Sequence, residues 1–302
     1  MKKIALIILH YKGKDFTGQC LESVKKLQTD NFKIEIIVVN NNPQENLDEL
    51  KRKFKNFVFL ETGKNLGFVG GNNFGIKRAL KDKADYIFLI NNDTTLASDV
   101  LVQLTKVAEE KKGAGILGPK IYFAPGYEYH RDRYKKSERG KVFWNAGGEI
   151  DWPNVIGTGR GVNEVDKGQY DQIEETDYVS GCGMFIKREV LDEIGFFDER
   201  YFLYYEDDDI SVRAKKAGWK LLFVPQARMW HFNAGSSEVG GPLHDYYMAR
   251  NRLLFGMKFA PLRAKIALFK WGLSRLIVGR PWQKIAFRDF LINRFGKGSY
   301  EA

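Results

Sequence analysis

The stretch "KIALIILHY" (residues 3–11) decides the fold, because its apolar residues follow one another without alternating with polar ones. A strand that is covered on both faces has this composition, and such strands are typical of parallel sheets. Similar runs recur in "KIEIIVVN" (33–40) and "DYIFLINND" (85–93), and segments with helical spacing separate them. The sequence therefore predicts an α/β protein with a doubly wound, mostly parallel sheet and helices on both faces.

The remaining elements follow from the same reading. Further strands are expected at 56–62, 113–123, 177–187 and 219–231, and helices at 46–54, 72–82 and 98–111. The segment "GYEYHRDRYKKSERGK" (126–141) interrupts the pattern and is expected to be a mobile or partner-facing loop. Residues 243–302 are expected to be a helical extension at the C-terminus.

The charge of the chain is concentrated at one end. The 302 residues carry a net charge of +10, and residues 245–302 hold 12 Lys or Arg against 3 acids. The rest of the chain is nearly neutral, so nucleic-acid binding is poorly supported. Cys20 and Cys182 do not form a CxxC pair, which favours reduced core thiols and a cytoplasmic location. The apolar run at 4–9 is too short for a signal peptide or a membrane span.

Ligands of doubly wound sheets bind beyond the carboxyl ends of the strands. This rule selects four segments as one rim: His10–Gly13, Asn40–Asn42, Gly63–Asn73 and Asn91–Thr95. The third contains a Gly-rich turn that lacks both a G-x-G-x-x-G fingerprint and a Walker A sequence. Its glycines would let the backbone approach a ligand, and the helix after them would offer free N–H groups. The alternative is that they only turn the chain into that helix.

Two motifs are candidates for a metal site. In "LINNDTTL" (89–96) an apolar strand ends in Asn91, Asn92 and Asp93, a cluster suited to Mg²⁺ or Mn²⁺. The alternative is an N-cap for the helix at 98–111. In "WHFNAG" (230–235) His231 ends another strand. A lone His is more often an ordinary polar residue, but convergence with Asp93 would favour a ligand.

The stretch "RYFLYYEDDDISVRAKKAG" (200–218) places four acids directly after large aromatic residues. Asp209 can pair with Arg213 at i, i+4 and is expected to be structural. Asp208 is expected to face solvent or the edge of a cleft. Glu206 and Asp207 fall where a helix begins, so a helix-dipole role is open. Adjacent carboxylates in a partly desolvated cleft should also have at least one raised pKa, as a general base requires.

These motifs, in this order, resemble the family 2 inverting glycosyltransferases of the GT-A fold, in particular the bacterial rhamnosyltransferase-like branch. The resemblance covers roughly residues 3–255. It is carried by "NLGFVGGNNFGI" (65–76), "LINNDTTL" (89–96), the block 179–219, "FVPQARMWH" (223–231) and "YYMARNRLLF" (246–255).

The resemblance implies roles for individual residues. Asp207 corresponds to the base, with Glu206 beside it, and Asp93 and His231 correspond to ligands of Mg²⁺ or Mn²⁺. The implied nucleotide-sugar residues are His10, Tyr11, Asn40, Asn42, Asn65, Gly67, Phe68, Gly71, Asn72, Asn91, Asn92 and Asp93. The aromatic residues before the acids are expected to form a sugar-stacking wall, so the implied acceptor residues are Tyr204, Tyr205 and Gly181.

The resemblance also implies an organisation of the chain. Residues 1–125 would be the nucleotide-sugar-binding half of the GT-A domain, and residues 126–240 its acceptor-binding and catalytic half. Residues 241–302 would be a basic, amphipathic helical tail. Basic amphipathic helices with Trp can lie on an anionic membrane surface, so residues 262–302 are expected to contact the inner face of the cytoplasmic membrane. The alternatives are that the tail folds back on the body or forms a homodimer.

The implied reaction is the transfer of L-rhamnose from dTDP-L-rhamnose to a hydroxyl of a glycan or lipid-linked acceptor, in the synthesis of cell-surface polysaccharide. UDP-sugars stay open as donors, since the family usually has an Asp where this chain has Asn40 and reads like "NYN" where this chain has "HYK" (10–12). Two other classes remain: a catalytically silent carbohydrate-binding member of an assembly complex, and a nucleotidyl- or phosphotransferase.

Overall fold

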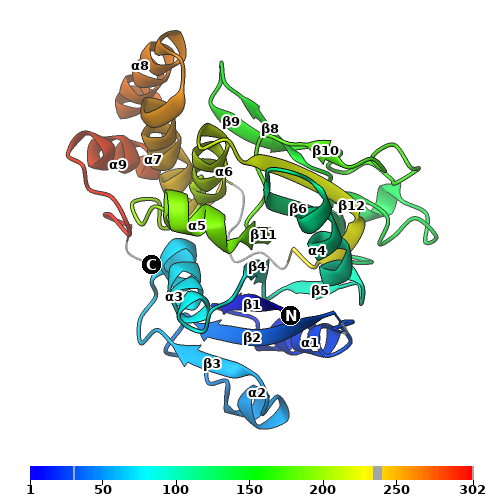
Figure 1. The fold of residues 1–302 in the computed structure, drawn as a ribbon. Coiled ribbons are helices and arrows are strands. Elements are labelled where there is room, and N and C mark those ends of the chain that lie inside the picture. The colour runs from blue at the N-terminus through cyan, green and yellow to red at the C-terminus, as the bar shows by residue number, and fades with distance from the viewer. Residues whose placement is uncertain (30, 234–239, 301–302) are drawn as a thin grey trace.

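The structure is a computed structural model that describes residues 1–29, 31–233 and 240–300. One large sheet runs through the molecule, and a group of three helices stands at one end of it (Figure 1). The strands of the large sheet are β1 (Lys2–His10), β2 (Phe32–Asn40), β3 (Val58–Glu61), β4 (Tyr86–Asn91), β5 (Thr94–Leu96), β6 (Ala114–Phe123), β7 (Phe143–Asn145), β10 (Glu174–Glu175), β11 (Gly183–Lys187) and β12 (Lys220–His231). A separate hairpin is formed by β8 (Gly148–Asp151) and β9 (Ile156–Gly159).

The helices follow the expected alternation with the strands. They are α1 (Lys14–Val24), α2 (Asp48–Lys53), α3 (Gly67–Lys81), α4 (Val100–Glu110), α5 (Arg188–Ile194), α6 (Glu206–Lys216), α7 (Pro242–Phe259), α8 (Leu262–Val278) and α9 (Pro281–Leu291), with a 3₁₀ turn at Arg131–Arg133. The expected strands and helices are thus present, and the C-terminal extension is helical. The assignment of separate roles to 1–125, 126–240 and 241–302 stays a prediction; residues 234–239 and 301–302 of these ranges, which include the end of "WHFNAG", lie outside the described residues.

The strand order of the large sheet is β10-β12-β6-β11-β4-β1-β2-β3, with β5 and β7 paired to β12 and β6. The N-terminal strands are parallel, as are β6 and β12, whereas β11 runs antiparallel to both of its neighbours, β4 and β6. The insertion of β11 brings the chain just before it to the carboxyl end of β4. The predicted α/β class is therefore confirmed, and the reversed strand connects the rim of the N-terminal strands to the second half of the chain.

Both faces of the sheet are covered, which explains the continuous apolar run that opens the chain. Ile4, Leu6 and Ile8 of β1 belong to one core, together with buried residues of α1, α2 and α4. Ala5 and Ile7 point to the opposite core, together with residues of α3, α5 and α6. Since neither face meets water, neither needs polar residues.

Two boundaries differ from the sequence prediction. The helix α3 begins at Gly67 instead of residue 72, because a Cβ at Gly71 would lie 2.4 Å from Leu9 Cδ1, so this glycine lets the helix pack closely on β1. The strand expected at 177–187 is limited to β11. In the 126–141 segment the buried carboxylate of Glu128 accepts hydrogen bonds from the N–H groups of Gly126 and Gly140, and its expected mobility or contact with a partner stays a prediction.

A strained segment precedes α6. Phe202, Tyr204 and Tyr205 have φ angles of 68°, 70° and 69°, in the left-handed region that side chains with a Cβ disfavour. Each such residue costs on the order of 1–3 kcal/mol, so the surrounding structure must hold the segment in place.

The side chains of Asn251 and Arg250 on α7 supply this restraint. The Asn251 amide is fully buried and donates to the carbonyl oxygens of Tyr201, Leu203 and Tyr204 at 2.9, 2.7 and 3.0 Å. Arg250 donates to the carbonyl of Tyr201 at 2.9 Å. We call this arrangement the α7 clamp. It satisfies carbonyl groups that the left-handed conformation leaves without regular secondary-structure partners.

The α7 clamp makes a testable contribution to stability. Replacing Asn251→Ala leaves buried carbonyl groups without donors, and unsatisfied buried groups cost about 1–3 kcal/mol each. We expect the free energy of unfolding, measured by urea denaturation, to fall by about 2–4 kcal/mol. The matched control is Asn56→Ala, at an exposed position, where a change of less than about 0.5 kcal/mol is expected. Equal effects of the two substitutions would contradict the clamp.

Candidate active site

Asp207 and Glu206 open helix α6, and their side chains have different surroundings. Asp207 is half-buried, and its two carboxylate oxygens accept hydrogen bonds from the N–H groups of Asp208 (3.0 Å) and Gly181 (3.1 Å). Glu206 is 4% exposed, and within the described residues its Oε2 has no hydrogen-bond partner. The expected position of both acids in the first turn of a helix is confirmed.

These surroundings shift the pKa values of the two acids to different extents. Burial raises the pKa of Glu206 well above its usual range, and the nearby charge of Asp207 raises it further. Burial also raises the pKa of Asp207, but the N–H donors of Gly181 and Asp208 oppose this shift by stabilising the carboxylate. The neutral form is therefore favoured more strongly at Glu206 than at Asp207, whose carboxylate is stabilised by two N–H donors.

The other two acids of the run are also buried. Asp209 is 0% exposed and accepts a hydrogen bond from Arg213 at 2.6 Å, while Lys258 of α7 pairs with its other oxygen. This confirms its expected structural role. Asp208 was expected at solvent or at a cleft edge, but it is 7% exposed and packs against Gly157 of β9. The hairpin β8–β9 covers it, which the sequence of α6 alone does not indicate.

The turn before β11 contacts both the Asp207 carboxylate and the end of β4. Gly181 binds the Asp207 carboxylate, and the carbonyl of the next residue, Cys182, accepts a hydrogen bond from the Asn91 N–H at 3.2 Å. Burial raises the pKa of the Cys182 thiol well above its usual value, and the charges of Asp93 and Asp207 both add to this effect. The chain at Gly181 and Cys182 therefore contacts both the start of α6 and the end of β4.

Asp93 and His231 converge as the sequence analysis required for a metal site. Asp93 Oδ1 lies 3.1 Å from His231 Nε2, and β5 pairs with the end of β12 to bring them together. The helix after this motif, α4, has Asp99 at its N-cap, so the capping alternative for Asp93 is wrong. A carboxylate and an imidazole suit a divalent cation, Mn²⁺ better than Mg²⁺.

Among residues 1–29, 31–233 and 240–300, however, no group of three or more His, Cys, Asp or Glu side chains could hold a metal ion. A cation held by Asp93 and His231 would therefore need further ligands from a substrate. Phosphate oxygens commonly complete the shell of such cations. The residues present fit a cation that binds together with a diphosphate.

The Gly-rich turn contacts the strained segment before α6. Gly67 has a φ of 73°, and a Cβ there would lie 2.5 Å from the carbonyl oxygen of Phe202. The N–H of Val69 donates to the same carbonyl at 3.2 Å, and the ring of Phe68 packs against Gly181. Position 67 therefore requires a glycine. The structure brings together the predicted nucleotide turn and the predicted acceptor segment.

The predicted rim residues fall into two groups. Tyr11, Asn42 and Asn92 are partly exposed: Asn42 donates to the Tyr11 carbonyl at 2.9 Å, and Asn92 donates to the Lys12 carbonyl at 2.8 Å. Asn65 and Asn91 are also not fully buried, although the Asn65 amide oxygen accepts a hydrogen bond from the Gly67 N–H. Their contact with a nucleotide stays a prediction.

The second group is buried. His10 is 0% exposed and its Nδ1 bonds to Thr17 Oγ1, so the imidazole has no surface for a ligand. Asn40 is 3% exposed and uses both ends of its amide within its own loop, with Glu45 and Asn42. Asn72 is 1% exposed and donates to the Phe68 carbonyl. These side chains support the rim loops in this structure, and their contact with a nucleotide, like that of Gly71, stays a prediction.

Asn41 is the residue that the sequence analysis missed. Its buried amide donates to the carbonyl of Gly67 at 2.9 Å and accepts from the N–H of Leu66 at 2.9 Å, so it fixes the start of α3. The signal was present in the Asn40–Asn42 run. The resemblance implied only the outer two residues of this run, whereas β2 ends at Asn40 and Asn41 begins the loop that contacts the Gly-rich turn.

The aromatic residues before α6 do not form the expected wall. The Tyr205 ring is 4% exposed, packs near Phe255, and its hydroxyl donates to the Val155 carbonyl. Phe202 stacks on Tyr247 of α7 with ring centroids 5.2 Å apart. The rings of Phe202 and Tyr205 thus lie against α7, and the contact of Tyr205 with an acceptor stays a prediction. Tyr204 is half-buried beside His244, and its contact with an acceptor stays a prediction, as does that of Gly181.

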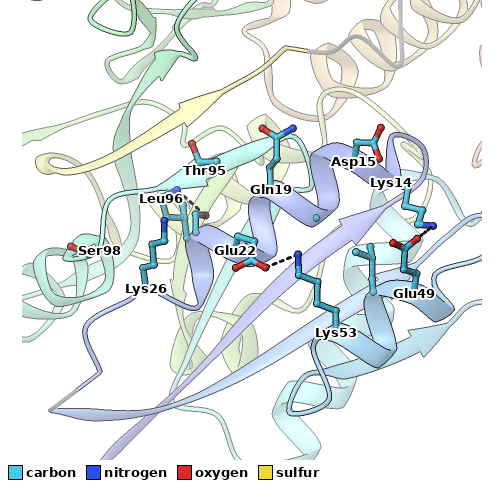
Figure 2. Close-up of a pocket in the computed structure, with 13 residues that line it drawn as sticks. Lys14, Asp15, Gln19, Glu22, Lys26, Glu49, Lys53, Thr95, Leu96 and Ser98 are labelled. Carbon is cyan, nitrogen blue, oxygen red and sulfur yellow. Dashed lines mark hydrogen bonds and ion pairs between the residues drawn. The ribbon is translucent and has the colours of Figure 1, made fainter.

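A polar cavity of about 640 Å³ lies elsewhere, between α1, α2 and β5. Figure 2 shows its lining, in which Lys53 pairs with Glu22 and Lys14 pairs with Glu49. Its lining includes neither Asp93 nor Asp207. Since four of its six charged side chains pair with each other and neither candidate acid lines it, this cavity is not assigned to the site.

Comparison with known proteins is consistent with this geometry. The sequence profile described as Glycosyl transferase family 2 matches residues 5–195, and a second profile, described as Glycosyl transferase family group 2, matches residues 164–292. The crystal structure of GalNAc-T7 with UDP, GalNAc and Mn²⁺ has a TM-score of 0.59 at 18% identity, and the match covers 76% of this chain and 44% of that one. This likeness shows the GT-A fold.

Two curated relatives are rhamnosyltransferases. The N-acetylglucosaminyl-diphospho-decaprenol L-rhamnosyltransferase of Mycobacterium tuberculosis is 29% identical over 197 residues, covering 62% of this chain and 62% of that protein, so the chain spans less than two thirds of this relative's length. The dTDP-rhamnosyl transferase RfbF of Shigella flexneri is 21% identical over 265 residues, covering 83% of this chain and 81% of that protein. With well over half of its length matched by the family profile, this chain belongs to glycosyl transferase family 2, in its rhamnosyltransferase-like branch.

Proposed function

We propose that this protein is an inverting, metal-dependent glycosyltransferase that moves L-rhamnose from dTDP-L-rhamnose to a hydroxyl of a glycan or lipid-linked acceptor, in the synthesis of cell-surface polysaccharide. The observation that carries the proposal is the half-buried Asp207 carboxylate, which is bound by two backbone N–H groups, one of them in the turn whose Cys182 carbonyl accepts a hydrogen bond from Asn91. The names of the two rhamnosyltransferase relatives support the sugar. A UDP-sugar is the competing donor, as in the GalNAc-T7 complex.

Asp207 acts as the general base in this proposal. Its carboxylate takes the proton of the acceptor hydroxyl while the hydroxyl oxygen bonds to the anomeric carbon of the donor. The bond from that carbon to the diphosphate breaks in the same step, and the electron pair leaves with the diphosphate. One displacement from the opposite face inverts the carbon. A protonated Glu206 keeps a second negative charge away from the base.

Asp93 and His231 would hold a divalent cation, Mg²⁺ or Mn²⁺, at the diphosphate end of the donor. When bound, the cation stabilises the negative charge of the leaving diphosphate. The contact of 3.1 Å between these two side chains supports a shared ligand position. The Asn92 amide donates hydrogen bonds to the Lys12 carbonyl and to Thr17 Oγ1, so it connects the metal motif to the chain that follows β1.

The proposed location is the cytoplasmic side of the membrane. Two buried free thiols, Cys20 and Cys182, support a reducing compartment. In the part of the chain that the structure describes, no helix has the length and apolar character needed to cross a bilayer. Peripheral association with the inner face of the membrane is supported by the exposed apolar residues of α8.

The base assignment is tested by a pair of isosteric substitutions. Asp207→Asn removes the proton acceptor, and general bases contribute about 10²- to 10⁴-fold, so kcat for rhamnosyl transfer from dTDP-L-rhamnose should fall by at least 10²-fold. Glu206→Gln imitates the protonated acid and should lower kcat by less than about tenfold. Calorimetry should find donor affinity unchanged in Asp207→Asn. A collapse of donor affinity would assign Asp207 to the donor site instead.

The acid side of the pH profile tests the electrostatics. The base works only when ionised, and burial raises the pKa of Asp207. Activity should therefore be lost as pH falls through a value higher than about 4, the ordinary pKa of an aspartate. The measurement is kcat against pH, with unfolding monitored at each pH. Full activity maintained down to pH 4 would contradict a raised pKa.

The metal assignment is tested by donor binding without turnover. In Mn²⁺, Asp93→Asn should reduce the affinity for dTDP-L-rhamnose to the value that the unchanged protein has in EDTA, because the cation no longer joins the diphosphate to the chain. In EDTA the two proteins should bind alike. The matched control is Asp192→Asn, on α5 and paired only with Arg188 among the ion pairs of the described residues. An equal Mn²⁺ effect in Asp93→Asn and the unchanged protein would reject this site.

A further inference from the structure

Helix α8 has an apolar face that nothing in the described chain covers. Its inner face packs on the body: a Cβ at Gly256 of α7 would lie 2.3 Å from Leu268 Cδ2, and Gly272 lies close to Phe287 of α9. Of the fifteen large apolar residues that are exposed among the described residues, seven belong to α8. Exposed apolar side chains scattered singly need no explanation, but a concentration on one helix does.

These residues form a continuous stripe. Neighbours at i+3 and i+4 share one face of a helix. At this spacing lie Leu262 (74% exposed), Ile266 (50%), Phe269 (41%), Leu273 (51%), Leu276 (40%) and Ile277 (78%), which we call the outer stripe. A helix of this length extends for about 25 Å, so the stripe is long enough to make a lasting contact with a surface.

The charges beside the outer stripe are all positive. By the 100° turn per residue, Arg263 and Lys270 lie along one border and Lys265 along the other. Helix α8 contains no acidic residue. The partner that matches an apolar stripe between basic borders is the interface of an anionic bilayer, where acyl chains receive the stripe and phosphate headgroups meet the basic side chains.

A second copy of this chain matches less well. In a two-fold symmetric dimer each patch meets its own copy. Packing of two outer stripes would then place the basic borders of one copy beside the basic borders of the other, with no acid on α8 to compensate.

The position of α8 connects this surface to the active site. Only Ala260 and Pro261 separate α8 from α7, and α7 carries the clamp that holds the segment before Asp207. Figure 1 shows α7, α8 and α9 as one group at the end of the molecule next to α5 and α6. A bilayer in contact with the outer stripe is therefore linked through one helix to the base segment.

We infer that the outer stripe of α8 docks on an anionic membrane, and that the acceptor is a glycan on a lipid carrier presented at that membrane. The second part rests on the proposed function, since it names the acceptor class of the same site. The docking itself does not depend on catalysis and can be measured without any sugar.

The test uses the full chain and vesicles with or without phosphatidylglycerol in phosphatidylcholine. The unchanged protein should float with the anionic vesicles, and flotation should fall at least tenfold on neutral vesicles. The triple variant Ile266→Ser, Leu273→Ser, Ile277→Ser should float at least tenfold less, because three inserted side chains are lost. The double variant Arg263→Glu, Lys270→Glu should lose binding to anionic vesicles. The control is Tyr129→Ser with Val162→Ser, at exposed apolar positions away from α8, which should float normally.

Activity distinguishes the two parts of the inference. The triple variant should retain turnover of a short water-soluble acceptor and lose at least tenfold on a lipid-carried acceptor in anionic vesicles. Equal flotation of the triple variant and the control would overturn the docking surface, as would a dimer that dissociates only in the triple variant. Equal turnover of the two acceptors by the triple variant would overturn the lipid-carried acceptor. Loss of turnover on both acceptors by the unchanged protein would instead reject the proposed function.

Discussion

The Asn251 amide holds together the part of the structure on which the site depends. Its hydrogen bonds to three carbonyl groups stabilise a segment in which Phe202, Tyr204 and Tyr205 all adopt left-handed backbone angles. That conformation ends at the first residue of α6, so it sets the direction in which the helix starts. With a relaxed segment, the N–H of Gly181 and the carboxylate of Asp207 would not be held at 3.1 Å.

The same segment also fixes the Gly-rich turn, through Gly67 and Val69 against the carbonyl of Phe202. One strained stretch therefore touches the turn assigned to the donor, the helix of the base and the C-terminal extension. Strain of this kind persists only where surrounding contacts overdetermine it, and it is concentrated at functional sites. The chemical consequence is a different environment for each of three adjacent acids. Asp209 is paired with Arg213 and Lys258, burial favours the neutral form of Glu206, and the half-buried Asp207 accepts hydrogen bonds from two backbone N–H groups.

The sequence predicts much of this arrangement because its signals are local. The continuous apolar runs of β1, β2 and β4 identify a sheet covered on both faces, and the placement of Asp93 and His231 at strand ends anticipates their convergence. The start of α3 was missed because glycine disfavours helices locally, whereas here Gly71 is required by the approach of β1. The roles of Asn41 and Asn251 depend on partners about 25 and 50 residues away, and the burial of Tyr205 follows from the φ angle of its own backbone. Contacts between residues so far apart in the sequence produce no local sequence pattern from which they could be predicted.

The central claim is that the clamped segment presents Asp207 to the acceptor hydroxyl. The most direct measurement is a crystal structure of the protein with a non-transferable analogue of dTDP-L-rhamnose and an acceptor both bound. The account predicts an acceptor hydroxyl oxygen about 3 Å from an Asp207 carboxylate oxygen, on the face of the anomeric carbon opposite the diphosphate. An acceptor hydroxyl that contacts a different side chain, with Asp207 still bound only to Gly181 and Asp208, would contradict it.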